Sequence, residues 1–396
     1  MIQISPETQL FIREHSSDDV RTLALQAKKY PDINMPTAIT QIAGRQVAAE
    51  KIPSWREIEE IWYPKHLSLE QCSSEITARY KARLFQGDSL TDLTGGFGID
   101  CSFLATGFKS ATYVERQEEL CEIAAHNFPI LNLNHINVRN EDGVAYLQTM
   151  SPVDCIFLDP ARRNEHGGKT VAISDCEPNV AELEDLLLSK ANRVMIKLSP
   201  MLDLSLALKE LKHTQEIHIL SVNNECKELL ILLRQTSPAE IAIHCVNLLT
   251  KGTQEEQHLV FTREQEQRSQ CTYTDSLGNY LYEPNASLLK AGAFRSIAAA
   301  YPVRKLHPNS HLYISDSFIE NFPGRIFRIV NQCSFNKKEV KENLADLKKA
   351  NVTVRNFPAT VAELRKRLHL TEGGDTYLFA STLNNGQKVI IRCEKV

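Results

Sequence analysis

The chain lacks closely spaced cysteines. Its 10 cysteines are scattered over 396 residues, and the two nearest each other in sequence are Cys226 and Cys245. No Cys-x-x-Cys pair of the zinc-binding or redox type occurs, and the cysteine density of a disulfide-stapled secreted domain is not reached. We therefore expect buried, reduced thiols and predict no metal site.

Long apolar runs are lacking as well. No stretch approaches the roughly 20 apolar residues of a membrane span, and the sequence does not open with a basic start followed by an apolar segment. We therefore expect a cytoplasmic protein without a membrane partner, and the sequence makes no prediction about its oligomeric state. At 396 residues the chain exceeds what one hydrophobic core usually fills, so several domains are expected.

A glycine-rich segment from Asp92 to Asp100 joins an apolar strand to a helix. Gly95, Gly96 and Gly98 let the backbone turn tightly and approach a bound molecule. A phosphate is disfavoured, because the Asp92 carboxylate would repel it and the third glycine of Gly-x-Gly-x-x-Gly is missing. S-adenosylmethionine (SAM), whose ammonium and sulfonium are positive, suits this charge, whereas an ordinary tight turn is the alternative. The predicted cofactor site here comprises Asp92, Thr94, Gly95, Gly96 and Gly98.

Acidic residues also follow three later strand-like segments. Glu115 lies roughly twenty residues beyond the loop, where doubly wound folds place a carboxylate against ribose hydroxyls. Asp142 could accept a hydrogen bond from an adenine amino group, or it could simply cap the following helix. Asp159 and Pro160 end the buried segment 153–158 and would point a carboxylate and rigid carbonyls into the ligand crevice of such folds.

Motifs I to IV of class I SAM-dependent methyltransferases are similar in order and spacing to Asp92–Gly98, Glu115, Asp142 and Asp159-Pro160. The resemblance covers about residues 85 to 235 and includes a fifth strand at 193–199. It ends in two strands, near 216–223 and 226–234, whose short connection makes them antiparallel. The resemblance implies an α/β, Rossmann-like core with SAM as cofactor and a seven-stranded sheet whose last strand is antiparallel.

The run Asp-Pro-Ala-Arg at 159–162 resembles the Asp-Pro-Pro-Tyr motif of amino-methyltransferases and the Asp-Pro-Pro-Arg motif of uracil C5-methyltransferases. Carbon methylation needs a cysteine nucleophile, and Leu198 stands where that family has it. The resemblance therefore implies in-line transfer to nitrogen, with Asp159 orienting or deprotonating an amine. Arg162 or Arg163 could stack on a base or hold a phosphate, or both could be solvated loop arginines. The predicted catalytic residues are Asp159, Pro160 and Arg162.

Residues 1–86 carry helically spaced apolar side chains, and Ser5-Pro6-Glu7 and Ser17-Asp18-Asp19 are helix-start signals. The segment 69–80 resembles one that folds over the methionine end of SAM in many nucleic-acid methyltransferases. A plain helix cap is the alternative. Its short polar side chains are Gln71, Ser73, Ser74 and Thr77, and of these we assign Gln71 and Ser74 to the cofactor site.

Positive charge is concentrated at the end of the sequence. Residues 324–396 contain 14 Lys and Arg against 7 Asp and Glu, a net of +7, whereas the whole chain has a net charge of −4. The pattern of strand, helix, strand, helix and a hairpin turned at Asn384-Asn385-Gly386 predicts a small α/β unit. It resembles the THUMP-like domain behind the core of a bacterial methyltransferase group, whose relatives bring RNA to modifying enzymes. RNA is therefore the expected partner, although solvated basic faces are common.

Four domains are predicted. They are an N-terminal helical domain (1–86), the methyltransferase core (87–236), a ferredoxin-like connecting domain (237–323) and the basic THUMP-like domain (324–396). The expected function is SAM-dependent methylation of an RNA base nitrogen. A small-molecule or protein methyltransferase and a non-catalytic RNA-binding protein are the alternatives; only RNA binding is expected to weaken strongly with salt.

Overall fold

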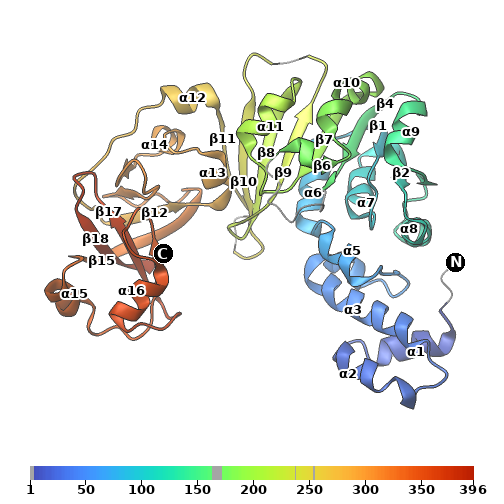
Figure 1. The fold of residues 1–396 in the computed structure, drawn as a ribbon, viewed down its shortest axis with the longest axis horizontal. Coiled ribbons are helices and arrows are strands. Elements are labelled where there is room, and N and C mark those ends of the chain that lie inside the picture. Colours follow the sequence, from blue (N-terminus) through green and yellow to red (C-terminus); the bar gives the residue numbers. More distant parts are fainter. Residues whose placement is uncertain (1–3, 163–171, 237, 253–254) are drawn as a thin grey trace. The chain divides into compact units, whose positions relative to one another are not determined.

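The computed structural model describes residues 4–162, 172–236, 238–252 and 255–396 (Figure 1). The chain divides into two compact units, Met1–Gln215 with Leu230–Ser237, and Glu216–Leu229 with Pro238–Val396. Within the described ranges, no helix is both long and apolar enough to cross a membrane.

The first unit begins with helices, as the apolar spacing predicted. Ser5 accepts a hydrogen bond from the Thr8 amide and Asp19 accepts one from the Thr22 amide, so both helix-start signals are true N-caps. Phe11, Leu23 and Ile42 belong to the apolar core that these helices share. The helices are α1 (Pro6–Glu14), α2 (Val20–Leu25), η1 (Ala27–Lys29), α3 (Met35–Lys51), α4 (Pro53–Arg56), α5 (His66–Gln71) and α6 (Glu75–Leu84).

A large, mostly parallel sheet follows. Its strands are β1 (Gly87–Asp92), β2 (Phe108–Glu115), β3 (Ile136–Asn140), β4 (Val153–Leu158), β7 (Ala191–Leu198), β8 (Thr214–Val222), β9 (Glu225–Leu233), β10 (Ala242–Leu248) and β11 (Glu256–Thr262). The order is β11-β10-β8-β9-β7-β4-β1-β2-β3. Asn223 and Asn224 join β8 to β9 with positive φ angles of 48° and 69°, as a two-residue hairpin requires, so β9 is antiparallel to β8. The predicted Rossmann-like fold with a reversed last strand is therefore confirmed.

Helices lie between successive strands of this sheet from β1 to β8 (Figure 1). They are α7 (Ile99–Ala105), α8 (Glu118–Ile130), α9 (Gly143–Thr149), α10 (Val180–Lys190) and α11 (Leu204–Glu210). Two short strands, β5 (Ala161–Arg162) and β6 (Cys176–Glu177), pair separately, and a 3₁₀ turn, η2 (Ile173–Asp175), precedes β6.

The sheet has nine strands where seven were expected. β10 pairs in parallel with β8, and β11 pairs antiparallel with β10. The strands near 239–262, which we assigned to the ferredoxin-like connecting domain, instead extend the large sheet. The physical reason is that an edge strand such as β8 exposes unpaired backbone groups, which another strand satisfies.

The rest of the second unit is built on a seven-stranded sheet of order β13-β14-β12-β15-β18-β17-β16. Because β12 pairs with β15, the segments before and after residue 324 share one sheet. The hairpin turn at Gly386 is as predicted, with φ of 87°. The first helix of the predicted strand-helix-strand-helix pattern, α15, ends at Leu344. The elements are α12 (Arg263–Arg268), β12 (Tyr280–Pro284), α13 (Ala286–Ala291), α14 (Ser296–Ala300), β13 (Arg304–Lys305), β14 (Tyr313–Ser315), β15 (Gly324–Ser334), α15 (Lys337–Leu344), β16 (Asn351–Val354), α16 (Val361–Leu368), β17 (Thr376–Thr382) and β18 (Lys388–Lys395).

Gly143 allows α9 to begin directly against the loop that follows β1. A Cβ atom at this position would lie 2.1 Å from the Leu93 carbonyl oxygen, a backbone atom that cannot move cheaply. We expect Gly143→Ala to lower the free energy of unfolding by about 1–3 kcal/mol through overpacking. Ala145→Gly, at an exposed position of the same helix, measures helix propensity alone and should cost about 1 kcal/mol. Denaturant unfolding checks both; a Gly143→Ala protein more stable than wild type would contradict the contact.

Candidate functional site

The carboxyl ends of two neighbouring strands bring Asp92 and Asp159 together. β1 and β4 are parallel, with Asp92 paired opposite Phe157. The Thr94 amide donates to Asp92 Oδ1 at 3.0 Å, and the Asp159 amide donates to Thr94 Oγ1 at 2.6 Å. Thr94, predicted to bind cofactor, thus connects the glycine-rich loop to the Asp-Pro loop.

The glycine loop needs its glycines for two different reasons. A Cβ at Gly95 would lie 2.2 Å from the Tyr113 ring, so this position is constrained by packing. Gly96 and Gly98 have φ angles of 54° and 86°, in the left-handed region that glycine adopts readily. Above Gly96 there is open space, since the nearest atom to an added Cβ would be the Thr94 carbonyl oxygen at 3.8 Å. A bound molecule can therefore approach the loop backbone at Gly96.

Glu115 is buried and already has two backbone partners. Its carboxylate accepts hydrogen bonds from the Gly96 amide and the Gln117 amide, each at 2.9 Å. This pairing fixes the carboxylate next to the glycine loop. Each oxygen retains acceptor capacity, so contact with a ribose stays a prediction.

Asp142 caps helix α9. Its Oδ1 accepts hydrogen bonds from the Val144 and Ala145 amides, both at 3.0 Å. The capping alternative is therefore confirmed. An additional contact with adenine stays a prediction, carried by the second carboxylate oxygen.

Asp92 has a buried oxygen without a partner. Its side chain is 1% exposed, and Oδ2 has no hydrogen-bond partner among the described residues. Burial raises the pKa of Asp92 to about 8, and the nearby Asp100, Asp159 and Glu115 carboxylates contribute to the rise. A buried acid with an unsatisfied oxygen is costly, which makes this position a candidate binding site for a donor or cation.

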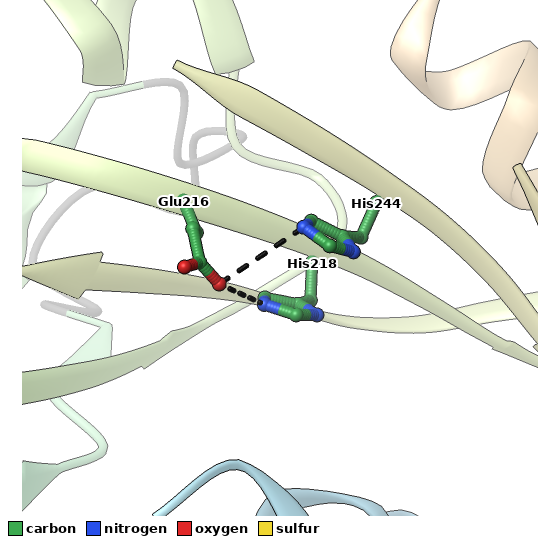
Figure 2. Close-up of side chains that lie close together, drawn as sticks. All are labelled: Glu216, His218 and His244. Atoms are coloured by element: carbon green, nitrogen blue, oxygen red, sulfur yellow. Dashed lines mark hydrogen bonds and ion pairs between the residues drawn. The ribbon is translucent and has the colours of Figure 1, made fainter. Parts of the chain in front are cut away.

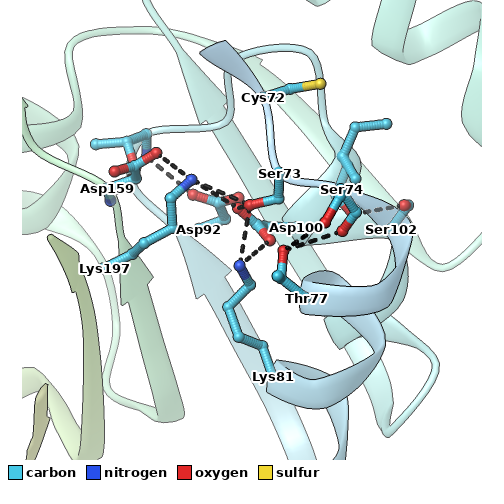
Figure 3. A network of polar contacts seen from close by, with 12 residues as sticks. Cys72, Ser73, Ser74, Thr77, Lys81, Asp92, Asp100, Ser102, Asp159 and Lys197 are labelled. Carbon is cyan, nitrogen blue, oxygen red and sulfur yellow. Dashed lines mark hydrogen bonds and ion pairs between the residues drawn. The ribbon is translucent and has the colours of Figure 1, made fainter. Parts of the chain in front are cut away.

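A buried polar network lies beside Asp92 (Figure 3). Asp100 accepts a hydrogen bond from Ser73 Oγ at 2.7 Å and pairs with Lys81 Nζ at 2.9 Å and Lys197 Nζ at 3.3 Å. Although burial acts to raise the pKa of Asp100, the two ammonium groups hold it below its usual value. Lys197 also pairs with Asp159 Oδ2 at 2.5 Å. The network therefore reaches the Asp-Pro loop.

Sequence reasoning missed Lys81, Asp100 and Lys197 as site residues. They come from α6, α7 and β7, and nothing in their spacing relates them. One signal was available: Lys197 is a charged residue inside the apolar run of a buried strand, where an unpaired ammonium would be very costly.

The segment before α6 contacts the buried polar network through Ser73 rather than through Gln71 or Ser74, the residues that we assigned to the cofactor site. Ser73, which we noted but did not assign, reaches Asp100, whereas Ser74 lies 3.2 Å from Thr77 Oγ1 at the start of α6. Gln71 is exposed at the end of α5. The cofactor roles of Gln71 and Ser74 stay predictions.

The Asp-Pro motif is partly described. Pro160 is buried and Ala161 is exposed at the start of β5. The side chain of Arg162 and the whole of Arg163 lie outside the described residues. Leu198 is 2% exposed and belongs to the apolar core. An apolar side chain therefore occupies the position that carries the cysteine nucleophile in uracil C5-methyltransferases.

Comparisons with known proteins agree with this architecture. Residues 280–323 match a ferredoxin-like domain and residues 324–395 match a THUMP domain-like family. The structure of the "putative methyltransferase from Porphyromonas gingivalis W83" is 34% identical to this chain, covers 100% of both chains and has a TM-score of 0.88.

More distant structures are similar over a part of the chain. An rRNA methylase from Streptococcus thermophilus is 14% identical and covers 40% of this chain and 94% of its own, with a TM-score of 0.31. A putative methyltransferase from Streptococcus mutans in complex with SAH is 12% identical and covers 40% and 96%, with a TM-score of 0.30. No match was found among curated proteins. From the end-to-end similarity at 34% identity and the two domain matches, the chain belongs to the methyltransferase family in which a class I core is followed by ferredoxin-like and THUMP-like domains.

Proposed function

We propose that the protein is a SAM-dependent methyltransferase that methylates a base nitrogen of RNA. The observation that carries this proposal is the meeting of Asp92 and Asp159 at adjacent strand ends, joined through Thr94 beside an open glycine loop. One acid is buried with an oxygen unpaired among the described residues, and the other has a side chain that is 36% exposed. The two acids are thus suited to different partners, a bound cofactor and an entering acceptor.

The residues around the loop fit SAM. The unpaired Asp92 Oδ2 is an acceptor for an ammonium, and the open space above Gly96 leaves room for the cofactor backbone. Glu115 would hold the ribose hydroxyls and Asp142 the adenine amino group. When bound, SAM supplies an electrophilic methyl group. Thr94, Gly95 and Gly98 keep the loop shaped to receive it.

Asp159 is held in a fixed position for an acceptor nitrogen. Its amide is tied to Thr94, and Lys197 holds its Oδ2 at 2.5 Å. A carboxylate positioned in this way can orient an N–H group for in-line transfer and take up the proton. The adjacent Lys197 ammonium disfavours a second cation, so a neutral base nitrogen fits better than a protonated protein amine. Pro160 stiffens the carbonyls beside it.

The C-terminal basic region offers a surface for RNA. Seven exposed cationic side chains, on or just after α15 and on α16, form no ion pair among the described residues. They are Lys337, Lys338, Lys341, Lys348, Lys349, Lys366 and Arg367. Phosphate contacts from such side chains bring RNA to the protein and make its affinity dependent on salt.

We expect Asp92→Asn to weaken SAM binding by about 10- to 100-fold, because the amide keeps the acceptor for Thr94 but loses the charge that pairs with the ammonium. Wild-type affinity should fall as the pH decreases below about 8, where Asp92 becomes protonated, by up to about tenfold per pH unit. The Asn variant should lack this dependence. Calorimetry between pH 6 and 9 measures the affinity of both proteins for SAM. Equal affinities and equal pH profiles for wild type and Asp92→Asn would show that Asp92 does not contact SAM.

For Asp159→Ala we expect SAM affinity near wild type and a rate of transfer lower by about 10²–10⁴-fold. Lys197→Met should also lower the rate, because it releases Asp159 from its fixed position. Single-turnover transfer from tritiated SAM to RNA of cells lacking this gene gives the rates, normalised to the folded fraction from a thermal melt. A folded Asp159→Ala protein that transfers at the wild-type rate would remove the role of Asp159 in orienting the acceptor.

Reversing charge on α15 should weaken RNA binding without affecting SAM. The triple change Lys337→Glu, Lys338→Glu and Lys341→Glu should reduce the slope of log affinity against log salt by up to about three, one for each lost phosphate contact. The control changes Arg21, Lys28 and Lys29, which are exposed on the N-terminal helices, to Glu. Filter binding measures both. Equal slopes for the two triple variants would place the RNA surface elsewhere.

The acceptor itself is identified by mass spectrometry of nucleosides from cells with and without this gene. A methylated nucleoside that disappears with the gene, and returns with wild type but not with Asp159→Ala, gives the base and the atom. An unchanged nucleoside profile would favour the small-molecule or protein alternative.

A further inference from the structure

Three polar side chains converge on one face of the large sheet, within the second unit. Glu216 and His218 are two residues apart on β8, so both point to the same face. His244 on β10 is the direct neighbour of His218 in the parallel ladder. The two imidazole rings stack with centroids 4.3 Å apart and an interplanar angle of 15°. Figure 2 shows the Glu216 carboxylate facing both rings.

The distances within this group are close to those of a metal site. Glu216 Oε2 lies 3.3 Å from His218 Nε2 and 3.9 Å from His244 Nε2, and one ligand atom from each residue falls within 4.8 Å of the others. Around a tetrahedral zinc ion with bonds of about 2.0–2.2 Å, ligand atoms are about 3.3–3.5 Å apart. Because the lone pair of each nitrogen lies in its ring plane, the two rings would rotate out of their stack when both bind one ion.

His258 on β11 supplies the support that a ligating histidine needs. Its Nε2 lies 3.2 Å from His244 Nδ1, and its Nδ1 lies 4.0 Å from Glu256 Oε1. If Nε2 of His244 binds a metal, its Nδ1 carries the proton and donates a hydrogen bond to Nε2 of His258, whose other nitrogen faces the Glu256 carboxylate. A hydrogen-bond acceptor at the nitrogen that does not bind the metal fixes the tautomer of a ligating histidine.

Burial and the neighbouring His218 and His258 lower the pKa of His244 to about 4. His218 is only 2% exposed, so its imidazole lies in the sheet surface rather than in solvent.

We propose that Glu216, His218 and His244 bind one zinc ion, with water as the fourth ligand and His258 as the outer support of His244. Two nitrogens and one carboxylate are a ligand set that zinc accepts. Because the ligands come from β8 and β10, the ion would cross-link β10 to its neighbouring strand β8. The cysteine spacing that led us to predict no metal site does not bear on this group, which contains no cysteine.

Zinc binding is tested on the full chain, stripped with chelator and titrated with Zn²⁺ in a calorimeter. We expect one ion per chain and a thermal melt that rises with Zn²⁺ and returns with EDTA. Co²⁺ in place of zinc should give the visible bands of tetrahedral coordination without a sulfur charge-transfer band. Absence of stoichiometric binding, or a sulfur band from the cysteines, would overturn the assignment.

Variants separate this group from other histidines. His258→Gln should lower the affinity by about 10- to 100-fold through loss of the outer support, and His244→Gln by at least as much. The control is His66→Gln, because His66 lies 3.7 Å from Glu70 on an exposed helix without a second histidine, and it should bind as wild type does. If His244→Gln binds zinc as tightly as wild type, the ion is held elsewhere. His258 is exposed, so its variant keeps the test valid if another fails to fold.

Discussion

A carboxylate buried between two ammonium groups is the interaction on which the candidate active site depends. Asp100 on α7 pairs with Lys81 from α6 and Lys197 from β7. Removing one partner of a buried ion pair costs about 3–5 kcal/mol, because the other charge is left without compensation. These three elements are therefore held together by a requirement for charge balance as well as by apolar packing.

The same pairing of buried charges also determines the environments of the two acids at the strand ends. Lys197 reaches from Asp100 to Asp159, so the acid of the Asp-Pro loop is restrained rather than mobile. Among the described residues Asp92 has no such ammonium partner, and burial together with the nearby carboxylates raises its pKa to about 8. The two acids lie at adjacent strand ends but differ in environment, as the proposed function requires of one acid that binds a cation and another that binds an acceptor amine.

Strand pairing decides how the rest of the chain is organised. The edge of β8 pairs with β10 and β10 pairs with β11, so residues 242–262 belong to the large sheet rather than to a separate connecting domain. In the second sheet, β12 pairs with β15, which makes the ferredoxin-like and THUMP-like segments one structural unit. Pairing in register also brings His218 beside His244.

The sequence by itself determined the local elements and the class of fold. The glycine loop after Asp92, the acids at later strand ends, the caps at Ser5 and Asp19 and the hairpin turn at Gly386 depend on backbone chemistry within a few residues, which the sequence displays directly. Only the tertiary structure decided that Lys81, Asp100 and Lys197 meet, that Thr94 connects two loops and that β10 extends the sheet. These contacts join residues far apart in the chain, so they depend on strand order, register and the need to neutralise buried charge. The spacing of residues within a short segment does not predict any of these.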